Sequence, residues 1–210
     1  MFNLCICIIA GYGKSLVLSD SMAKYVNMGD HDVKAFRGDT VRRLTDRIRF
    51  GEVEVSGYSR ILIHVGSNDL SNMVSSGHVN RLTVFHMMDR YVALRNSIRR
   101  RNSQAVLLIS AVLPRVNRFT LFKPYIIGLN FSLEKWCAKT RGACIFIPSY
   151  DSFMVRGEPN AALISDKDGL HLDGGGVDVL EGLFQQALST GYLGVRVRTA
   201  RTYLLRTLEY

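Results

Sequence analysis

The sequence predicts a three-layer α/β fold, in which helices cover both faces of a central parallel sheet. Apolar runs of strand length alternate with longer stretches whose apolar residues repeat with the period of a helix. The short runs are nearly continuous in Val, Ile and Leu, which is typical of strands buried on both faces. Such alternation favours strand–helix–strand units with right-handed crossovers.

The predicted elements follow one another along a single domain. Strands are predicted at residues 15–18, 33–36, 60–65, 105–113 and 144–148. Helices are predicted where apolar side chains share one face: Val41, Leu44 and Ile48; Val79, Leu82, Phe85 and Val92; Ile126, Leu129, Leu133 and Trp136; and Val177, Leu180, Phe184, Ala187 and Leu188. The second helix should end near Arg101 and the last near Gly191. Loops are expected at 71–80, 115–124 and 156–167.

Length and composition fit one domain with a short appendage at each end. The chain has 210 residues, 47% of them hydrophobic and 21% charged, which is the balance of an ordinary globular protein. We expect the domain at 15–190, an N-terminal appendage at 1–14 and a basic C-terminal tail at 191–210.

The cysteines and the N-terminal apolar run bear on the cellular setting. The four cysteines form no zinc pattern, and we interpret them as reduced thiols. The apolar run at 4–10 is far shorter than the roughly 20 residues of a spanning helix. No Lys or Arg precedes it, as would be expected in a signal peptide. We therefore expect no transmembrane segment and an intracellular, cytoplasmic protein; an atypical signal, an upstream segment or an extra buried strand stay open.

The chain is basic, with a formal net charge of +9. Arginines cluster at 42–49, at 99–101 and at 196–206. Such clusters would attract nucleic acid or an anionic surface, and salt would weaken the attraction. The interpretation we favour is a solvated helix surface and a loose tail.

Ser21 is the candidate nucleophile. The phrase Ser19-Asp20-Ser21-Met22 directly follows the apolar run at 16–18. A turn at this strand end can expose the serine hydroxyl, which needs a base within hydrogen-bond reach to attack a carbonyl. The alternative role is a helix N-cap.

His171 is the candidate base and Asp168 the carboxylate that orients it. Among the five histidines, His171 alone has a carboxylate three residues before it in a glycine-containing loop, whereas His64 falls within a buried strand. A turn across 168–171 can bring the carboxylate to Nδ1 and fix the tautomer of the ring. The alternative is a loop histidine beside a solvated aspartate.

Gly38 and Asn68 are candidate donors to an oxyanion. Each follows a predicted strand, and a glycine lets the backbone approach a ligand closely. With the Ser21 N–H, they could hold the oxyanion of a tetrahedral intermediate. Their alternative roles are a plain turn glycine and an N-cap or turn residue. All four phrases fall at predicted strand carboxyl ends or in the last loop, where active sites of such sheets lie.

These phrases, in this order, resemble the SGNH (GDSL-type) hydrolase superfamily over about residues 15–188. The blocks are Ser19-Asp20-Ser21, Gly38, Gly66-Ser67-Asn68-Asp69 and Asp168-Gly169-Leu170-His171. The resemblance implies a flavodoxin-like sheet of five parallel strands in the order 2-1-3-4-5. It also implies Ser21 as nucleophile, His171 as base, Asp168 as its partner, and an oxyanion hole of Ser21, Gly38 and Asn68, with no metal or cofactor.

Two residues depart from the family pattern. Ser19 stands where the family usually has glycine, and Leu172 stands where proline often follows the histidine. Neither change removes a catalytic atom. More loosely, the chain resembles esterase domains carried by eukaryotic transposable elements.

The expected function is therefore that of a serine esterase. It would cleave carboxylic esters of small acyl groups, such as acetyl, through an acyl-enzyme. The alternative is a weakly active or inactive module of the same fold that acts through its basic surface.

Overall fold

Five parallel strands form the central sheet, in the order β2-β1-β3-β4-β5. The strands are β1 (Ser15–Ser19), β2 (Asp32–Ala35), β3 (Arg60–His64), β4 (Val106–Ser110) and β5 (Cys144–Ile147). The computed structural model describes residues 13–77, 79, 80, 82–140 and 142–189. It confirms the predicted sheet and its order.

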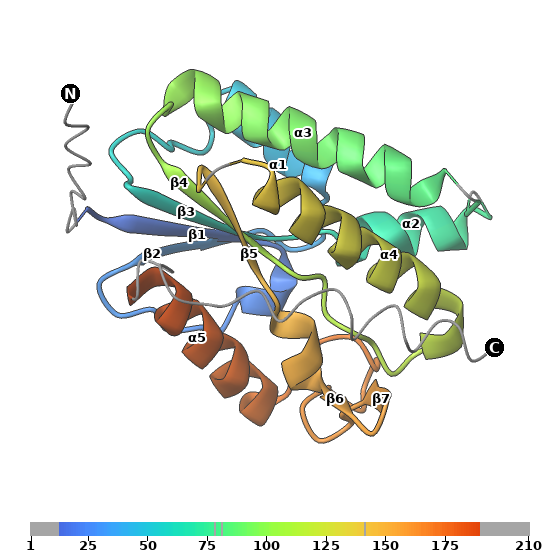
Figure 1. The fold of residues 1–210 in the computed structure, drawn as a ribbon. Helices are drawn as coiled ribbons and strands as arrows, with labels where there is room; N and C mark the ends of the chain where they lie inside the picture. Colours follow the sequence, from blue (N-terminus) through green and yellow to red (C-terminus); the bar gives the residue numbers. More distant parts are fainter. Residues whose placement is uncertain (1–12, 78, 81, 141, 190–210) are drawn as a thin grey trace, which may run out of the picture.

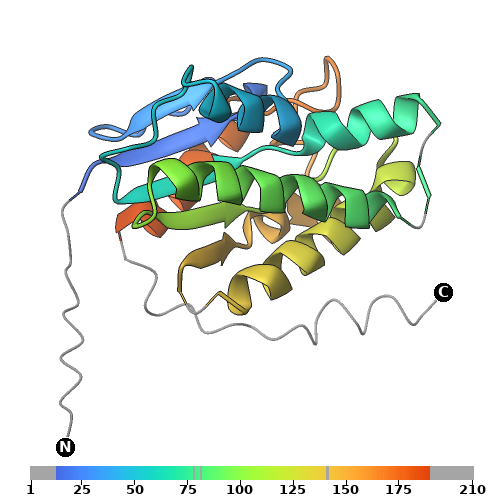
Figure 2. The ribbon, with the colours of Figure 1, turned by 90° about the horizontal axis from the view of Figure 1, so that it is seen from above.

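Helices cover both faces of the sheet, as predicted. Helices α1 (Val41–Arg49), α3 (Thr83–Arg101) and α4 (Phe119–Ala138) lie on one face, and α5 (Gly174–Ser189) lies on the other (Figure 1). Seen from above, the first three and the short α2 (Ser67–Ser75) form a continuous layer (Figure 2). Two 3₁₀ helices, η1 (Ser21–Ala23) and η2 (Ser149–Phe153), follow β1 and β5.

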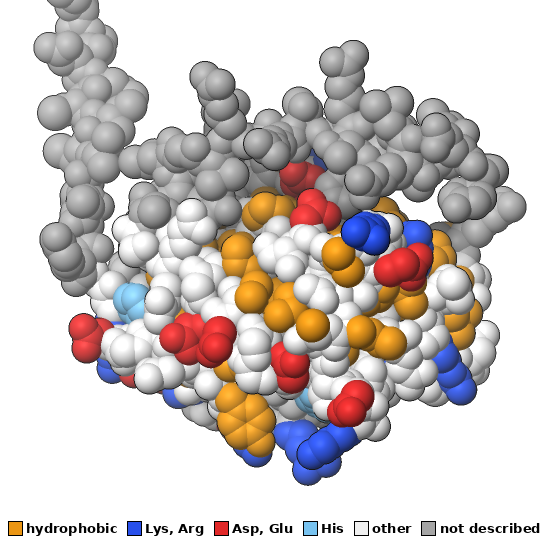
Figure 3. Space-filling model, turned by 90° about the horizontal axis from the view of Figure 1, so that it is seen from below, with side chains coloured by type: hydrophobic (Ala, Val, Ile, Leu, Met, Phe, Trp, Pro, Cys, Tyr) orange, Lys and Arg blue, Asp and Glu red, His pale blue; other side chains and the backbone are white. Residues whose placement is uncertain are grey.

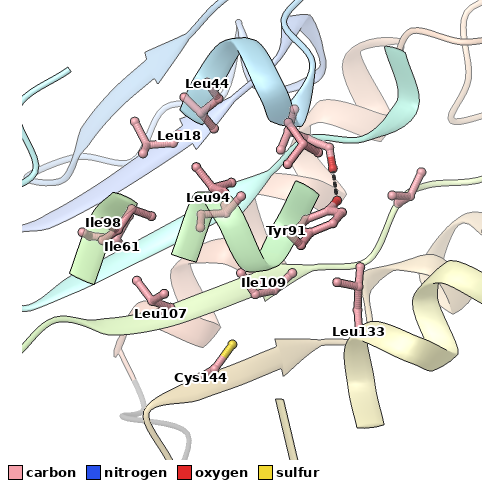
Figure 4. Close-up of a cluster of buried hydrophobic side chains, with 14 of the residues drawn as sticks. Leu18, Leu44, Ile61, Tyr91, Leu94, Ile98, Leu107, Ile109, Leu133 and Cys144 are labelled. Atoms are coloured by element: carbon pink, nitrogen blue, oxygen red, sulfur yellow. Dashed lines mark hydrogen bonds between the residues drawn. The ribbon is translucent and has the colours of Figure 1, made fainter. Parts of the chain in front are cut away.

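The sheet divides the core into two parts, because successive strand residues point to opposite faces. Leu16 and Leu18 pack in the cluster under α1, α3 and α4, while Val17 between them packs with α5. All three are fully buried, at 0% exposure. This two-sided burial is why the strand sequences are continuously apolar. Figure 4 shows the larger cluster, in which the Tyr91 hydroxyl donates a hydrogen bond to the carbonyl of Val65.

The prediction of one helix starting at Val79 was wrong. Residues 71–75, predicted to be loop, belong to α2, and α3 begins only at Thr83. Leu82 and Phe85, predicted to face the core, are 55% and 60% exposed. The buried stripe of α3 consists of Thr83, Met87, Tyr91, Leu94, Ser97 and Ile98. The prediction rested on the bulkiest apolar residues, which here lie on the exposed first turn.

Three further boundaries differ from the predictions. Helix α4 begins at Phe119 and contains Pro124, so the loop ends at 118. The segment at 111–113 is buried but lies outside β4, because burial alone does not require strand pairing. A small antiparallel pair, β6 (Met154–Val155) and β7 (Glu158–Pro159), enters the loop predicted at 156–167.

The predicted appendages lie largely outside the described residues, as do the Gly191 stop signal, Cys5 and Cys7. Lys14 is described and belongs to the body, because its carbonyl accepts a hydrogen bond from the Ser59 N–H at 3.0 Å. Cys137 and Cys144 are buried free thiols, with their Sγ atoms 2.9 Å apart. Within the described ranges, no helix combines the length and apolarity needed to cross a membrane.

His64 lies in strand β3, as predicted, and its ring is buried between the sheet and α5. Nδ1 is hydrogen-bonded to Ser110 Oγ at 2.9 Å, and the ring meets Phe184 edge-on at 5.5 Å between centroids. Burial lowers the pKa of His64 from 6.5 to about 4. The ring is therefore neutral at physiological pH and serves packing.

We expect His64 to make the fold less stable in acid. Between pH 6.5 and about 4 the unfolded chain binds a proton at His64 that the folded chain does not. The free energy of unfolding should fall as the pH decreases through this window, by roughly 3 kcal/mol in all. Urea unfolding of wild type, His64→Gln and the control His31→Gln at several pH values measures this. Only His64→Gln should flatten the slope; equal slopes in all three proteins would contradict the assignment.

Candidate active site

The carboxyl ends of β1, β2 and β3 bring three of the predicted phrases to one edge of the sheet. The Phe36 N–H donates to the Ser19 carbonyl at 2.9 Å, and the Asp20 N–H donates to the His64 carbonyl at 3.3 Å. These bonds extend the sheet pairing just past the strand ends. They fix the start of the loops that carry Ser21, Gly38 and Asn68.

Ser21, His171 and Asp168 form one chain of hydrogen bonds. Ser21 Oγ lies 2.8 Å from His171 Nε2, although the two residues are 150 positions apart. His171 Nδ1 lies 2.5 Å from Asp168 Oδ2. With the proton on Nδ1, the ring donates to Asp168, and Nε2 is left to accept from the serine hydroxyl. The structure thus brings together the three side chains that the sequence singled out.

The turn at 168–171 holds the carboxylate in its ionised form. Asp168 Oδ1 accepts the backbone N–H groups of Leu170 and His171, each at 2.9 Å. Partial burial opposes ionisation, but the bonds from the His171 ring and these two N–H groups prevail. They lower the pKa of Asp168 to about 2. The carboxylate is therefore charged throughout the physiological range.

Gly169 joins this turn to the loop that follows β4. Its φ is +62°, and a Cβ at this position would lie 2.8 Å from the Asn117 nitrogen. Its carbonyl accepts the N–H groups of Val116 and Asn117 at 2.8 and 3.1 Å. Only glycine fits both the backbone conformation and the close approach.

Two backbone donors belong to the loops at this edge of the sheet. The N–H groups of Ser21 and Gly38 have no protein acceptor among the described residues. Gly38 has a φ of +74°, and a Cβ there would meet nothing within 4 Å, so the backbone conformation rather than space requires glycine. Asn68 lies at the same edge, and its Nδ2 donates to the Asp39 carbonyl at 2.9 Å.

Asp20 is the site residue to which the sequence assigned no role. It is 1% exposed, and its Oδ1 accepts the Met22 N–H at 3.0 Å as the N-cap of η1. The alternative role of Ser21 as a helix N-cap is therefore wrong, since Ser21 is the first residue inside η1. Burial raises the pKa of Asp20 to about 7, against the Met22 bond and the nearby His171. Its second oxygen lies 3.5 Å from Asn68 Nδ2, so Asp20 links the serine turn to the asparagine.

A cavity of about 660 Å³ lies between α1, α2 and α3, apart from the serine–histidine pair. Thr40 and Asp69, next in sequence to the site loops, line it, but Ser21 and His171 do not. Asp69 is engaged by the Val41 N–H at 2.8 Å and by Arg90 at 2.6 Å. The cavity therefore contacts residues next to the site loops but not the candidate nucleophile.

The described arginine clusters are largely bound to the protein itself. Arg47 pairs with Asp39 and Glu52, Arg99 donates to the Ala143 carbonyl, and Arg101 donates to the Arg49 carbonyl. These residues lie in or near the last turns of α1 and α3, where cations favour the helix dipole. Figure 3 shows the opposite side of the molecule, where α5 lies, and acidic and basic side chains are scattered there without a continuous basic surface. The contacts of the first two clusters favour their interpretation as a solvated helix surface. The third cluster lies outside the described residues.

The groups brought together at the site are a hydroxyl, an imidazole and a carboxylate. In the described part of the chain, no three His, Cys, Asp or Glu side chains are grouped as metal ligands. A hydroxyl, an imidazole, a carboxylate and N–H donors without a described acceptor are the kinds of group from which a serine hydrolase site can be built.

Comparison with known proteins places the fold. No family model matches the sequence, and no curated protein sequence matches it. Among solved structures, a Bacteroides fragilis protein named as an acylhydrolase has 18% identity and a TM-score of 0.68, over 85% of this chain and 88% of its own. A carbohydrate esterase family 3 protein from Talaromyces cellulolyticus has 15% identity and a TM-score of 0.63, over 84% and 96%. The chain has the SGNH hydrolase fold.

Further matches agree with this fold. The lipase Lip_vut3 from a goat rumen metagenome matches at 15% identity and a TM-score of 0.65, over 83% of this chain and 96% of its own. The esterase domain of the zebrafish ZfL2-1 ORF1 protein matches at 20% identity with a TM-score of 0.46, too low a similarity to support the looser resemblance to transposon domains. The fold implied by the family resemblance is confirmed, and the roles of the site residues remain predictions.

Proposed function

We propose that this protein hydrolyses carboxylic esters of small acyl groups through an acyl-enzyme on Ser21. The observation that carries the proposal is the hydrogen-bonded chain from Ser21 Oγ through His171 to Asp168, at 2.8 and 2.5 Å. Such a chain activates a hydroxyl that is otherwise a poor nucleophile. The SGNH hydrolase fold, with its esterase and lipase neighbours, adds support.

In the first step, Ser21 Oγ attacks the ester carbonyl while His171 Nε2 takes its proton. The negative charge that develops on the carbonyl oxygen is stabilised by the N–H groups of Ser21 and Gly38 and by the Asn68 amide. Asn68 must then exchange its bond to the Asp39 carbonyl for one to the oxyanion. The imidazolium, held by the Asp168 carboxylate, gives its proton to the leaving alkoxide, and the alcohol departs.

In the second step, His171 takes a proton from water, and the resulting nucleophile attacks the acyl-enzyme. The tetrahedral intermediate collapses, His171 returns the proton to Ser21 Oγ, and the carboxylic acid leaves. Asp168 stabilises the positive ring in both steps, because its pKa of about 2 keeps the carboxylate ionised. All groups in this path belong to the chain, so the proposed reaction needs no metal or cofactor.

Rapid-mixing hydrolysis of 4-nitrophenyl acetate tests the proposal. We expect nitrophenol release in a burst that approaches one equivalent per protein, followed by a slower linear phase, because an activated ester should acylate Ser21 faster than the acyl-enzyme is hydrolysed. The chain with His171→Gln, mixed under the same conditions, is the control and should give no burst. No release above the spontaneous rate by the wild type would contradict the proposed function.

A further inference from the structure

Arg115 is an arginine that the proposed chemistry does not use, and it is almost completely buried beside the candidate site. Only 9% of the residue is exposed. Among the described residues, no carboxylate lies within ion-pair distance of its guanidinium. A buried charge without a counter-ion is costly, so a partner outside the described contacts would be favoured.

The guanidinium of Arg115 has one hydrogen bond and one aromatic contact that fix its position, and its other nitrogens have no described partner. Nη1 donates to Ser71 Oγ at 2.8 Å, and the guanidinium carbon lies 4.0 Å from the centre of the Phe122 ring. Nε is buried and has no hydrogen-bond partner. Nη2 likewise has no hydrogen-bond partner among the described residues. A fixed guanidinium whose remaining N–H groups have no described partner is suited to binding an anion.

Arg115 and the two residues after it contact the elements that carry the donor and the base of the candidate site. On one side, Ser71 is three residues after Asn68 in α2, and such residues are neighbours on a helix, with about 5–6 Å between Cβ atoms. On the other side, Val116 and Asn117 bind the carbonyl of Gly169, inside the turn that carries the acid and the base. Burial lowers the pKa of Arg115, and Asp168 opposes this, which indicates that the two charges sense each other.

We propose that Arg115 binds an anionic group of the substrate, so that the preferred esters carry a carboxylate or phosphate near the scissile bond. This inference rests on the proposed function and narrows its substrate class. Ser71 and the Phe122 ring fix the guanidinium, which lowers the conformational entropy lost when the anion binds. Arg115 is a specificity-determining residue in this account, since it touches the substrate away from the reacting atoms.

Matched ester pairs test the selectivity. In the first pair, monophenyl glutarate carries a carboxylate on the acyl side and phenyl valerate is its neutral counterpart. In the second pair, 3-acetoxybenzoate carries a carboxylate on the alcohol side and phenyl acetate is its neutral counterpart. We expect wild type to prefer the anionic member of at least one pair, as a ratio of kcat/KM values after subtraction of spontaneous hydrolysis. Arg115→Met should lower that ratio by about 10- to 100-fold, mainly through KM, because a charge-assisted hydrogen bond is lost. Arg115→Lys should keep part of it.

Arg95→Met is the control, because Arg95 also has a buried, unpartnered Nε and lies over an aromatic ring, that of Trp136. It should leave both ratios unchanged. Ratios that are the same in Arg115→Met and wild type for both pairs would overturn the inference. So would a wild type without anionic preference.

A binding measurement separates this inference from the proposed function. In the full chain with Ser21→Ala, calorimetric titration should detect saturable binding of glutarate or benzoate, weakened by adding Arg115→Met. If the chain binds an anion but its wild type hydrolyses no ester, the anion site is supported and the proposed esterase function is contradicted. If the wild type hydrolyses neutral esters and neither anion binds at millimolar concentration, the esterase function is supported and the anion site is overturned.

Discussion

Replacing Ser21 with alanine is expected to lower kcat for 4-nitrophenyl acetate by about 10⁴- to 10⁶-fold. The substitution removes the atom that would form the acyl-enzyme, and among the described residues it breaks one side-chain hydrogen bond, to His171. The cost to the free energy of unfolding should be near 1 kcal/mol, as for a single partly buried hydrogen bond. Initial rates and urea unfolding of the same preparation give both numbers.

Ser56→Ala is the matched control for this change, because Ser56 is an exposed serine in the loop before the amino end of β3, whereas the site lies at the carboxyl ends of the strands. Its rate should equal that of wild type. If Ser21→Ala kept more than a few per cent of the wild-type rate with its fold intact, Ser21 could not be the nucleophile.

Asp168→Asn is expected to reduce kcat by about 10⁴-fold, the second largest effect. Asparagine keeps the size of the side chain and an oxygen for the N–H groups of Leu170 and His171, so the turn should persist. It lacks the charge that stabilises the imidazolium and no longer fixes the tautomer with Nε2 free. Because the Asp168 pKa is about 2, the wild-type carboxylate stays ionised down to that pH, and the deficit should appear across the whole range from pH 5 to 8.

Asp166→Asn, an exposed aspartate in the same loop, is the control and should leave the rate unchanged. Steady-state rates of the three proteins at several pH values decide the matter. A loss of less than tenfold in Asp168→Asn would show that the ring of His171 does not depend on this carboxylate.

The sheet was predictable mainly from its central strands, which are buried on both faces and are therefore continuously apolar. The run at 16–18 and the run at 61–63 show this pattern, and both lie in the central strands β1 and β3. The start of α3 was not predictable from apolar spacing. Leu82 and Phe85 lie at helical spacing but on an exposed turn, while Thr83 contributes to the buried face. Short α2 offers too few apolar residues for its period to be detected.

The meeting of Ser21, His171 and Asp168 was predictable from local chemistry, because a short phrase places each at a strand end or in the last loop. Ser21, Gly38 and Asn68 follow parallel strands, whose carboxyl ends share one edge. The surroundings of Asp20 and Arg115 were not predictable in this way. Asp20 is buried and approaches Asn68, and no carboxylate in the described part of the chain lies within ion-pair distance of Arg115; both facts depend on side chains brought together only by folding.

The central claim is that the Ser21 hydroxyl is activated for attack, and covalent labelling tests it most directly. A fluorophosphonate probe reacts with an activated serine, and tryptic digestion isolates Ser21 in the peptide from Ser15 to Lys24, which contains Ser15 and Ser19 as well. The account predicts one label per chain on Ser21, located by fragmentation and absent from His171→Gln. A protein that cleaves esters while its label lies on another residue, or that takes no label, would contradict it.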